Sequence, residues 1–206
     1  MEASRLASDM KKKALEVFKA SGGQLRMSEA IDNGISRYML YSLRDIGMIE
    51  QISRGVYRLS ELPPMGNPDL VTVSLRFPHA VICLFSALAY HNITTQIPRK
   101  VYVAVSRNSR PPSLEYPPLS VHRFSKQAFQ VGIEEHIIDG VTTKIYSVEK
   151  TLADCFKFRN KLGMDVVLEA LKMSMARKKL NLDELISYAK ICRVEKIMYP
   201  YLEATL

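Results

Sequence analysis

The sequence predicts an α+β fold, in which a small N-terminal module precedes a larger mixed domain. Residues 34–59 combine a short helical pattern with two short segments of alternating apolar residues. Residues 101–146 contain further strand patterns, and the chain from Ser147 onward has a helical pattern. Strands followed by a run of helices are typical of α+β domains. We therefore expect the second domain to contain a small β-sheet followed by a C-terminal helical bundle.

The N-terminal module is expected to contain three helices. Apolar residues at three- and four-residue spacing predict a first helix over residues 4–20. A second, short helix is predicted over residues 27–33, and Gly34 after it can adopt the positive φ of a tight turn. Ser36 is a favourable N-cap residue. It predicts a third helix that begins at the next residue and spans residues 37–46.

A hairpin is predicted directly after the third helix. Gly47 is placed to end that helix in the left-handed conformation. Residues 48–53 and 56–59 then predict two strands that are joined across Arg54 and Gly55. Two helices joined by a tight turn and followed by a hairpin are the order of a winged helix-turn-helix, which is a DNA-reading module.

The third helix has one apolar and one polar side at about 100° per residue. The apolar side, which we expect to pack inward, carries Met39, Leu40, Leu43 and Ile46. In a helix-turn-helix, the exposed N-terminal residues of this helix enter the major groove. The residues that we predict to face the bases are Arg37, Tyr38, Tyr41 and Ser42. An arginine can donate two hydrogen bonds to guanine, and the other side chains can reach a phosphate, a base or a thymine methyl group.

Basic residues outside the third helix are candidates for phosphate contacts. Arg54 at the hairpin tip is placed to reach a phosphate or the minor groove. Lys11 and Lys12, in a run of three lysines on the first helix, are predicted to reach phosphates. Two alternatives stay open, because such a run is also typical of a solvated helix face, and a helix-turn-helix can mediate protein contacts alone.

The second domain follows a turn-rich hinge at Leu62–Pro68, so we place the two domains at residues 1–62 and 68–206. Its strands are predicted over residues 101–105, 121–124, 133–138 and 142–146, the last two forming a hairpin across Asp139-Gly140. Its helices are predicted over residues 85–91, 147–159, 164–177, 182–190 and 194–204.

The net charge of +8 favours nucleic acid or another acidic partner. Residues 1–62 contain 10 Lys and Arg against 8 Asp and Glu, whereas residues 63–206 contain 19 against 13. The second domain therefore carries most of the excess. Its candidate basic surface consists of Arg107, Arg110, Lys157, Arg159, Lys161, Arg177, Lys178 and Lys179. Each of them, taken alone, is more typical of a plain solvated charge.

No pattern of catalytic or metal-binding residues is found in the sequence. Cys83, Cys155 and Cys192 are widely separated and lie in apolar surroundings, which is typical of small buried side chains. The four histidines have no metal-ligand spacing, and no phosphate-binding glycine loop is present. Glu149 and Asp154 are offset by about 140° around a helix, so we interpret them as helix-cap and ion-pair residues. We expect no metal, no cofactor and no enzymatic activity.

The location of the protein is predicted from two further features. The N-terminus is polar and charged, which is not the pattern of a secretory signal peptide. No apolar run approaches the ~18–20 residues that are needed to span a bilayer. We therefore expect a cytoplasmic protein.

Several motifs occur together in an order that resembles the AbiEi antitoxin family, the antitoxins of bacterial type IV toxin-antitoxin systems. In the first domain they are GG at 22–23, GI at 34–35 and SRGVY at 53–57. In the second domain they are PHAVI at 78–82, SALAYH at 86–91 and YSVEKTLAD at 146–154. The family often has threonine where this chain has Met27. The resemblance favours a helix over residues 69–76, a segment for which the residues alone leave helix or strand open.

The resemblance implies a DNA-binding regulator that represses its own operon by binding operator DNA, with paired copies on inverted repeats. It further implies that the protein counteracts a co-encoded nucleotidyltransferase-like toxin. Such antitoxins are described as acting without necessarily forming a stable complex with the toxin, so direct contact stays open. Two alternatives are a winged-helix regulator whose second domain senses a small molecule, and an enzyme fused to a DNA reader.

Overall fold

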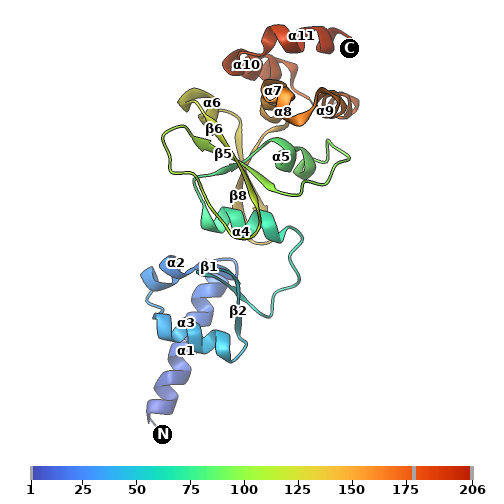
Figure 1. Ribbon diagram of the computed structural model, residues 1–206. Coiled ribbons are helices and arrows are strands. Elements are labelled where there is room, and N and C mark those ends of the chain that lie inside the picture. Colours follow the sequence, from blue (N-terminus) through green and yellow to red (C-terminus); the bar gives the residue numbers. More distant parts are fainter. Residues whose placement is uncertain (1, 178–179, 205–206) are drawn as a thin grey trace. The chain divides into compact units, whose positions relative to one another are not determined.

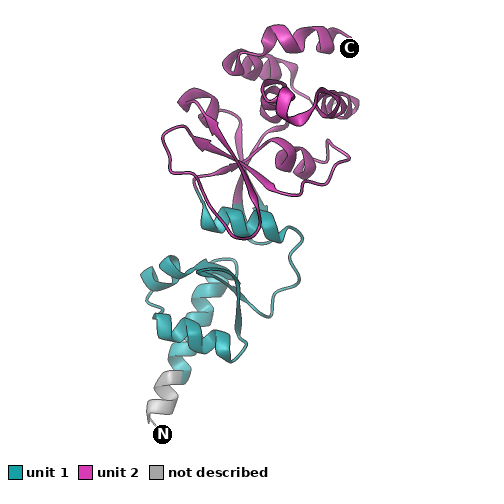
Figure 2. Cartoon of the chain, viewed as in Figure 1, with its two compact units in different colours: residues 1–78, 137–142 teal, residues 79–136, 143–206 magenta. Residues whose placement is uncertain are grey.

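The computed structural model describes residues 2–177 and 180–204, and it contains both helices and strands (Figure 1). The chain folds into two compact units (Figure 2). Unit 1 comprises residues 1–78 and 137–142, and unit 2 comprises the remaining segments, 79–136 and 143–206. Many helices and two separate sheets confirm the predicted α+β class. The first unit includes a helix and a turn that lie outside residues 1–62, where the sequence places the first domain.

Unit 1 follows the predicted order of helices and strands. Its elements are α1 (Glu2–Ala20), β1 (Gln24–Arg26), α2 (Met27–Asp32), α3 (Arg37–Asp45), β2 (Ile49–Ser53), β3 (Val56–Leu59) and α4 (Pro68–Arg76). The three strands form an antiparallel sheet in the order β1-β3-β2. The hairpin of β2 and β3 has an irregularity in register between Gln51 and Ser53. The helix that the resemblance favoured over residues 69–76 is present as α4.

Both ends of α3 are fixed by local hydrogen bonds. The Oγ of Ser36 accepts a hydrogen bond from the backbone N–H of Met39 at 3.2 Å, which confirms the predicted N-cap. After the helix, Gly47 has a φ of +75°. The N–H of Met48 then donates to the carbonyl of Leu43 at 2.9 Å, which closes a Schellman motif. The helix and the turn that follows it are therefore specified by adjacent residues.

The core of unit 1 lies between α1, α3 and the small sheet. Its largest fully buried side chains are Phe18, Leu40, Leu43, Ile49 and Tyr57. The predicted inward face of α3 is confirmed, except at one position. The side chain of Ile46 is 50% exposed. The helix ends at Asp45 and Ile46 is its C-cap residue, so the side chain of Ile46 does not continue the buried face.

Unit 2 contains a five-stranded sheet in the order β6-β5-β4-β8-β7. Its strands are β4 (Val81–Ile82), β5 (Val101–Ser106), β6 (Leu119–Phe124), β7 (Ile133–Ile138) and β8 (Val141–Tyr146). The turn between β7 and β8 groups with unit 1. Strands β5 and β6 pair in parallel from Val101 opposite Leu119 to Ser106 opposite Phe124. Parallel pairing needs a long crossover, and the Pro- and Ser-rich loop at residues 107–118 supplies it.

The helices of unit 2 depart from prediction at two places. They are α5 (Leu84–Tyr90), α6 (Lys126–Gln130), α7 (Val148–Lys157), α8 (Arg159–Leu162), α9 (Met164–Ala176), α10 (Leu182–Cys192) and α11 (Glu195–Glu203). The short α6 was not predicted. The helix predicted over residues 147–159 is wrong at its end, because Phe158 leaves helical geometry and separates α7 from α8. The ring of Phe158 packs 5.6 Å from that of Phe124, which holds the break in place.

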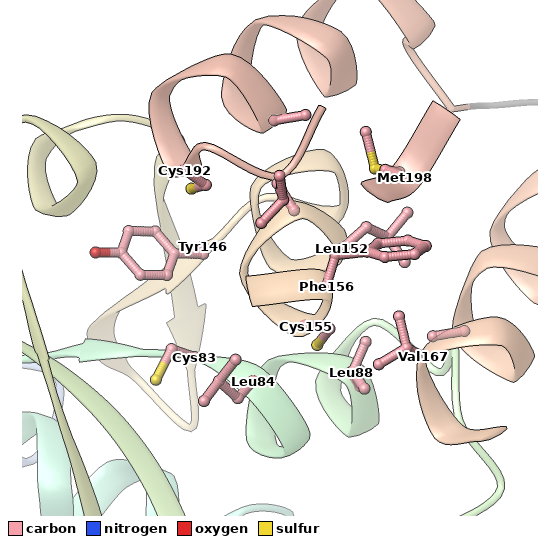
Figure 3. Packing of buried hydrophobic residues seen from close by; sticks show 14 of the residues in the cluster. Cys83, Leu84, Leu88, Tyr146, Leu152, Cys155, Phe156, Val167, Cys192 and Met198 are labelled. Atoms are coloured by element: carbon pink, nitrogen blue, oxygen red, sulfur yellow. The ribbon is translucent and has the colours of Figure 1, made fainter. Parts of the chain in front are cut away.

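The core of unit 2 is built around α7 (Figure 3). Leu152, Cys155 and Phe156 of this helix are fully buried among side chains of the neighbouring helices. Cys83 and Cys192 are buried as well and, like Cys155, are free thiols. This confirms the interpretation of the cysteines as small buried side chains.

The same core encloses an ion pair on one side of α7. The Nζ of Lys150 lies 2.5 Å from Oδ2 of Asp154, and neither side chain is exposed at all. The thiol of Cys192 donates to the other oxygen of Asp154 at 3.2 Å. The ammonium group also lies over the ring of Tyr146, 4.1 Å from its centre. The interpretation of Asp154 as an ion-pair residue is confirmed.

Candidate nucleic-acid interface

The polar side of α3 is open to solvent. Arg37 and Tyr38 are exposed, and the ring of Tyr38 is 80% exposed. One turn later, Tyr41 is 41% exposed and Ser42 is half-buried. Because Met39, Leu40 and Leu43 anchor the opposite side of the helix, these four side chains are held outward on one rigid surface. The four residues that we predict to face the bases therefore share one face.

The arginines of α3 and of the hairpin tip differ in whether they have a carboxylate partner. Arg44 forms a salt bridge with Asp45 at 2.8 Å, and its guanidinium lies 5.1 Å from the centre of the Tyr41 ring. Within the part of the chain that the structure describes, Arg37 and Arg54 make no ion pair. A solvated arginine without a carboxylate partner is free to donate to a phosphate or to a guanine edge. Arg37 and Arg54 are therefore the better placed of these three arginines for contacts with nucleic acid.

A hollow of about 470 Å³ lies beside α3 and the hairpin of β2 and β3. It is lined by Met27, Tyr41, Arg44, Gln51, Arg54, Gly55, Tyr57 and Arg76. The backbone of Gly55 at the hairpin tip has a φ of +72°, which glycine adopts without steric cost. Arg76 was not among the predicted site residues, because it belongs to α4 and lies beyond the predicted boundary at residue 62. No local sequence pattern identifies it.

The three lysines of the run on α1 differ in their surroundings. Lys12 is exposed and Lys11 is half-buried, so both can reach solvent. The neighbouring Lys13 lines a smaller hollow of about 190 Å³ beside the turn between α2 and α3, together with Gly34 and Ser36. Lys13 is thus the member of the run that lies next to the start of α3. The proposed phosphate contacts of Lys11 and Lys12 stay predictions.

The cations predicted on the second domain fall into two groups. Arg107, Arg110, Lys157 and Lys161 are exposed, whereas two arginines have partners in the backbone. Arg159 donates to the carbonyl of Phe156 at 3.0 Å. Arg177 donates to the carbonyls of His91 and Asn92, both at 2.6 Å, and so ties the end of α9 to the end of α5. Lys178 and Lys179 lie outside the described residues.

The described residues contain few groups with the properties of a reactive site. Among residues 2–177 and 180–204, no three His, Cys, Asp or Glu side chains are grouped so that they would hold a metal ion. Burial raises the pKa of the thiols of Cys83 and Cys155 well above its ordinary value, and that of Cys192 to about 12, so all three stay protonated near neutral pH. Burial also lowers the pKa of His91, whose Nε2 lies 2.7 Å from the carbonyl of Tyr146. No helix of the described chain is both long enough and apolar enough to cross a bilayer.

The segment that contains α3 and the hairpin is similar to a known protein family. Residues 12–60 match the sequence model of a family described as "Transcriptional regulator, AbiEi antitoxin". The N-terminal region matches the AbiEi antitoxin family. The matched segment runs from within α1 to just past β3, so it contains α3 and the whole hairpin. The resemblance seen in the sequence is confirmed for this AbiEi-type region.

The fold of most of the chain is similar to that of a solved structure. The crystal structure of the RV2827C protein from Mycobacterium tuberculosis aligns with a TM-score of 0.57 over 91% of this chain and 71% of that chain. The two sequences are 15% identical, so the likeness concerns the fold. No curated protein sequence matches this chain.

Proposed function

We propose that this protein is a DNA-binding transcriptional regulator that reads operator DNA with a winged helix-turn-helix formed by α2, α3 and the β2–β3 hairpin. The main support is the exposed polar face of α3 within the segment that matches the AbiEi antitoxin family. Helix α2, the turn at Gly34 and α3 have the order of a helix-turn-helix. A regulator of this kind acts where the DNA is, so we place it in the cytoplasm.

In the proposed complex, α3 lies in the major groove and the hairpin follows the adjacent backbone. Arg37, in the first turn of α3, donates to the O6 and N7 of a guanine. Tyr38 and Tyr41 contact phosphate or a thymine methyl group, and Ser42 reaches a base or a phosphate. Arg54 reaches a phosphate or the minor groove from the hairpin tip. Two copies of the chain occupy an inverted repeat, as a twofold-symmetric operator requires.

Binding to DNA from upstream of the gene should fall as salt rises, and Arg37→Ala should weaken it about tenfold to a hundredfold. The loss of a bidentate contact with a base costs roughly 1–3 kcal/mol, and a tenfold to hundredfold loss, which is about 1.4–2.8 kcal/mol, lies within that range. Affinity is measured by fluorescence anisotropy on the upstream duplex and on a scrambled duplex of the same composition. The matched control is Arg99→Gln, which removes an exposed arginine of unit 2. An Arg37→Ala protein with wild-type affinity for the upstream duplex would remove Arg37 from the recognition surface.

We further propose that the protein represses its own operon and opposes a co-encoded nucleotidyltransferase-like toxin. The support is the family match of the N-terminal region, together with three segments of the second domain that resemble motifs of that family, at residues 78–82, 86–91 and 146–154. The basic side chains of unit 2 that stay exposed are available for an acidic partner. They are Arg107, Arg110, Lys157 and Lys161.

Expression of the neighbouring gene alone should stop growth, and co-expression of this chain should restore it. The experiment uses inducible plasmids, with growth as the readout. Co-expression of the Arg37→Ala variant from a foreign promoter is the control, because it separates protection from repression. If the neighbouring gene is harmless alone, or if this chain gives no protection, the antitoxin assignment fails while the DNA-binding assignment is unaffected.

A further inference from the structure

The last residue of α4 reaches the tip of the β2–β3 hairpin. Nη1 of Arg76 donates a hydrogen bond to the backbone carbonyl of Arg54. A Cβ atom added to Gly55 would lie 3.8 Å from the same nitrogen, so the guanidinium rests against the turn itself. All three residues line the hollow beside α3 and the hairpin. Arg76 lies outside residues 1–62, the predicted DNA-binding domain. Its side chain nevertheless forms part of the wall of this hollow, which is a groove beside α3 and the hairpin.

The arginines that line this groove outnumber the carboxylates that pair with them. Three arginines line it, and only Arg44 has a carboxylate partner in the described structure, namely Asp45. Arg54 and Arg76 form no ion pair with any described residue. In addition, Nε of Arg76 is buried and has no hydrogen-bond partner within the described chain. Buried N–H groups are nearly always bonded, so an unpartnered one beside a cationic groove indicates a missing acceptor.

We propose that the sugar-phosphate backbone of a DNA duplex lies in this groove, and that Arg76 donates to one of its phosphates. This inference rests on the proposed function, and it extends the DNA-binding surface from the AbiEi-type region to α4. Nη1 stays on the Arg54 carbonyl, which fixes the guanidinium plane and leaves its other N–H groups for the phosphate. A guanidinium suits this task because it presents several donors in one rigid plane.

The contact provides affinity rather than sequence recognition. Arg76 is separated from the exposed face of α3 by the groove, and a phosphate is the same at every base pair. Each phosphate contact releases counterions, so its loss lowers the steepness with which affinity falls with salt. A residue that only supports the hairpin, with Arg54 still in contact with its phosphate, would lower affinity without changing that steepness. The salt dependence therefore distinguishes a phosphate contact from a positioning role.

The test measures the affinity of the full-length chain for the upstream duplex and for a scrambled duplex over a series of salt concentrations. The variants are Arg76→Gln and Arg76→Met, which remove the charge, and Arg76→Lys, which keeps it. Arg99→Gln is the matched control for net charge, because Arg99 is exposed and lies in unit 2. Circular dichroism verifies that each variant is folded, and two neutral replacements keep the test valid if one of them is not.

We expect Arg76→Gln and Arg76→Met to weaken binding to both duplexes about tenfold near 0.1 M salt. The slope of log K against log salt should become shallower by about 0.9, whereas Arg76→Lys and Arg99→Gln should keep the wild-type slope. Weaker binding at an unchanged slope would overturn the phosphate contact, and so would wild-type affinity of both neutral variants. In either case an Arg37→Ala defect on the upstream duplex would leave the proposed function standing. A wild-type chain that binds neither duplex would instead refute the proposed function itself.

Discussion

Replacing Asp154 with alanine should destabilise unit 2 by about 3–5 kcal/mol, because the change leaves the ammonium group of Lys150 buried without its counter-charge. Both side chains of this pair are completely buried, and their charged atoms are 2.5 Å apart. The ammonium group also lies over the rings of Tyr146 and Phe124, with centres at 4.1 and 4.9 Å. Such rings attract a cation but do not replace a carboxylate.

Urea unfolding, followed by circular dichroism, measures this loss. We expect the midpoint to fall by roughly 1–2 M. The matched control is Lys190→Ala, because Lys190 pairs with Glu195 at the surface of the same unit, at 3.6 Å. An exposed pair of this kind contributes about 1 kcal/mol or less. The double variant Lys150→Met/Asp154→Leu removes both charges and should recover most of the lost stability. Equal losses in Asp154→Ala and Lys190→Ala would show that burial adds nothing to the importance of the pair.

The parts of the fold that the sequence predicted well are those with signals between adjacent residues. Helix α3 is specified by the cap at Ser36, by the spacing of Leu40 and Leu43, and by the glycine at position 47. The hairpin follows because Gly55 can adopt a positive φ between two alternating segments. The exposed side of α3 was predicted for the same reason, since it is the complement of the buried side.

The parts that the sequence did not predict depend on contacts between distant segments. The parallel pairing of β5 with β6 and the order of the five strands leave no local signal. Arg76 joins the candidate interface only because α4 brings it to the carbonyl of Arg54. The pairing of Lys150 with Asp154 has the i, i+4 spacing of a helix pair, yet spacing alone does not show that both side chains are buried. Burial depends on the packing of α5, α9 and α10 around α7, which no local pattern reveals.

The packing of Gly132 against α7 gives the second prediction with a large effect. Gly132 has a φ of +68°, and its carbonyl accepts a hydrogen bond from the backbone N–H of Ser147 at 2.8 Å. A Cβ atom added at this position would lie 2.5 Å from Cβ of Lys150, and 3.3 Å from Cζ of Tyr188. Non-bonded carbon atoms essentially never approach to 2.5 Å, and Cβ of Lys150 is fixed by the helix backbone. The bend at Gly132, which precedes β7, or α7 itself must therefore move in Gly132→Ala.

Gly132→Ala should reduce the free energy of unfolding by roughly 2–5 kcal/mol. About 1–2 kcal/mol of this arises from alanine at a positive φ, and a further 1–3 kcal/mol from overpacking. Gly47→Ala separates the two contributions, because Gly47 has a φ of +75° and no atom within 4 Å of its added Cβ. The control should therefore show only the backbone cost, measured by urea unfolding as a change from wild type. Equal losses in the two variants would mean that α7 accommodates the extra atom without a packing cost.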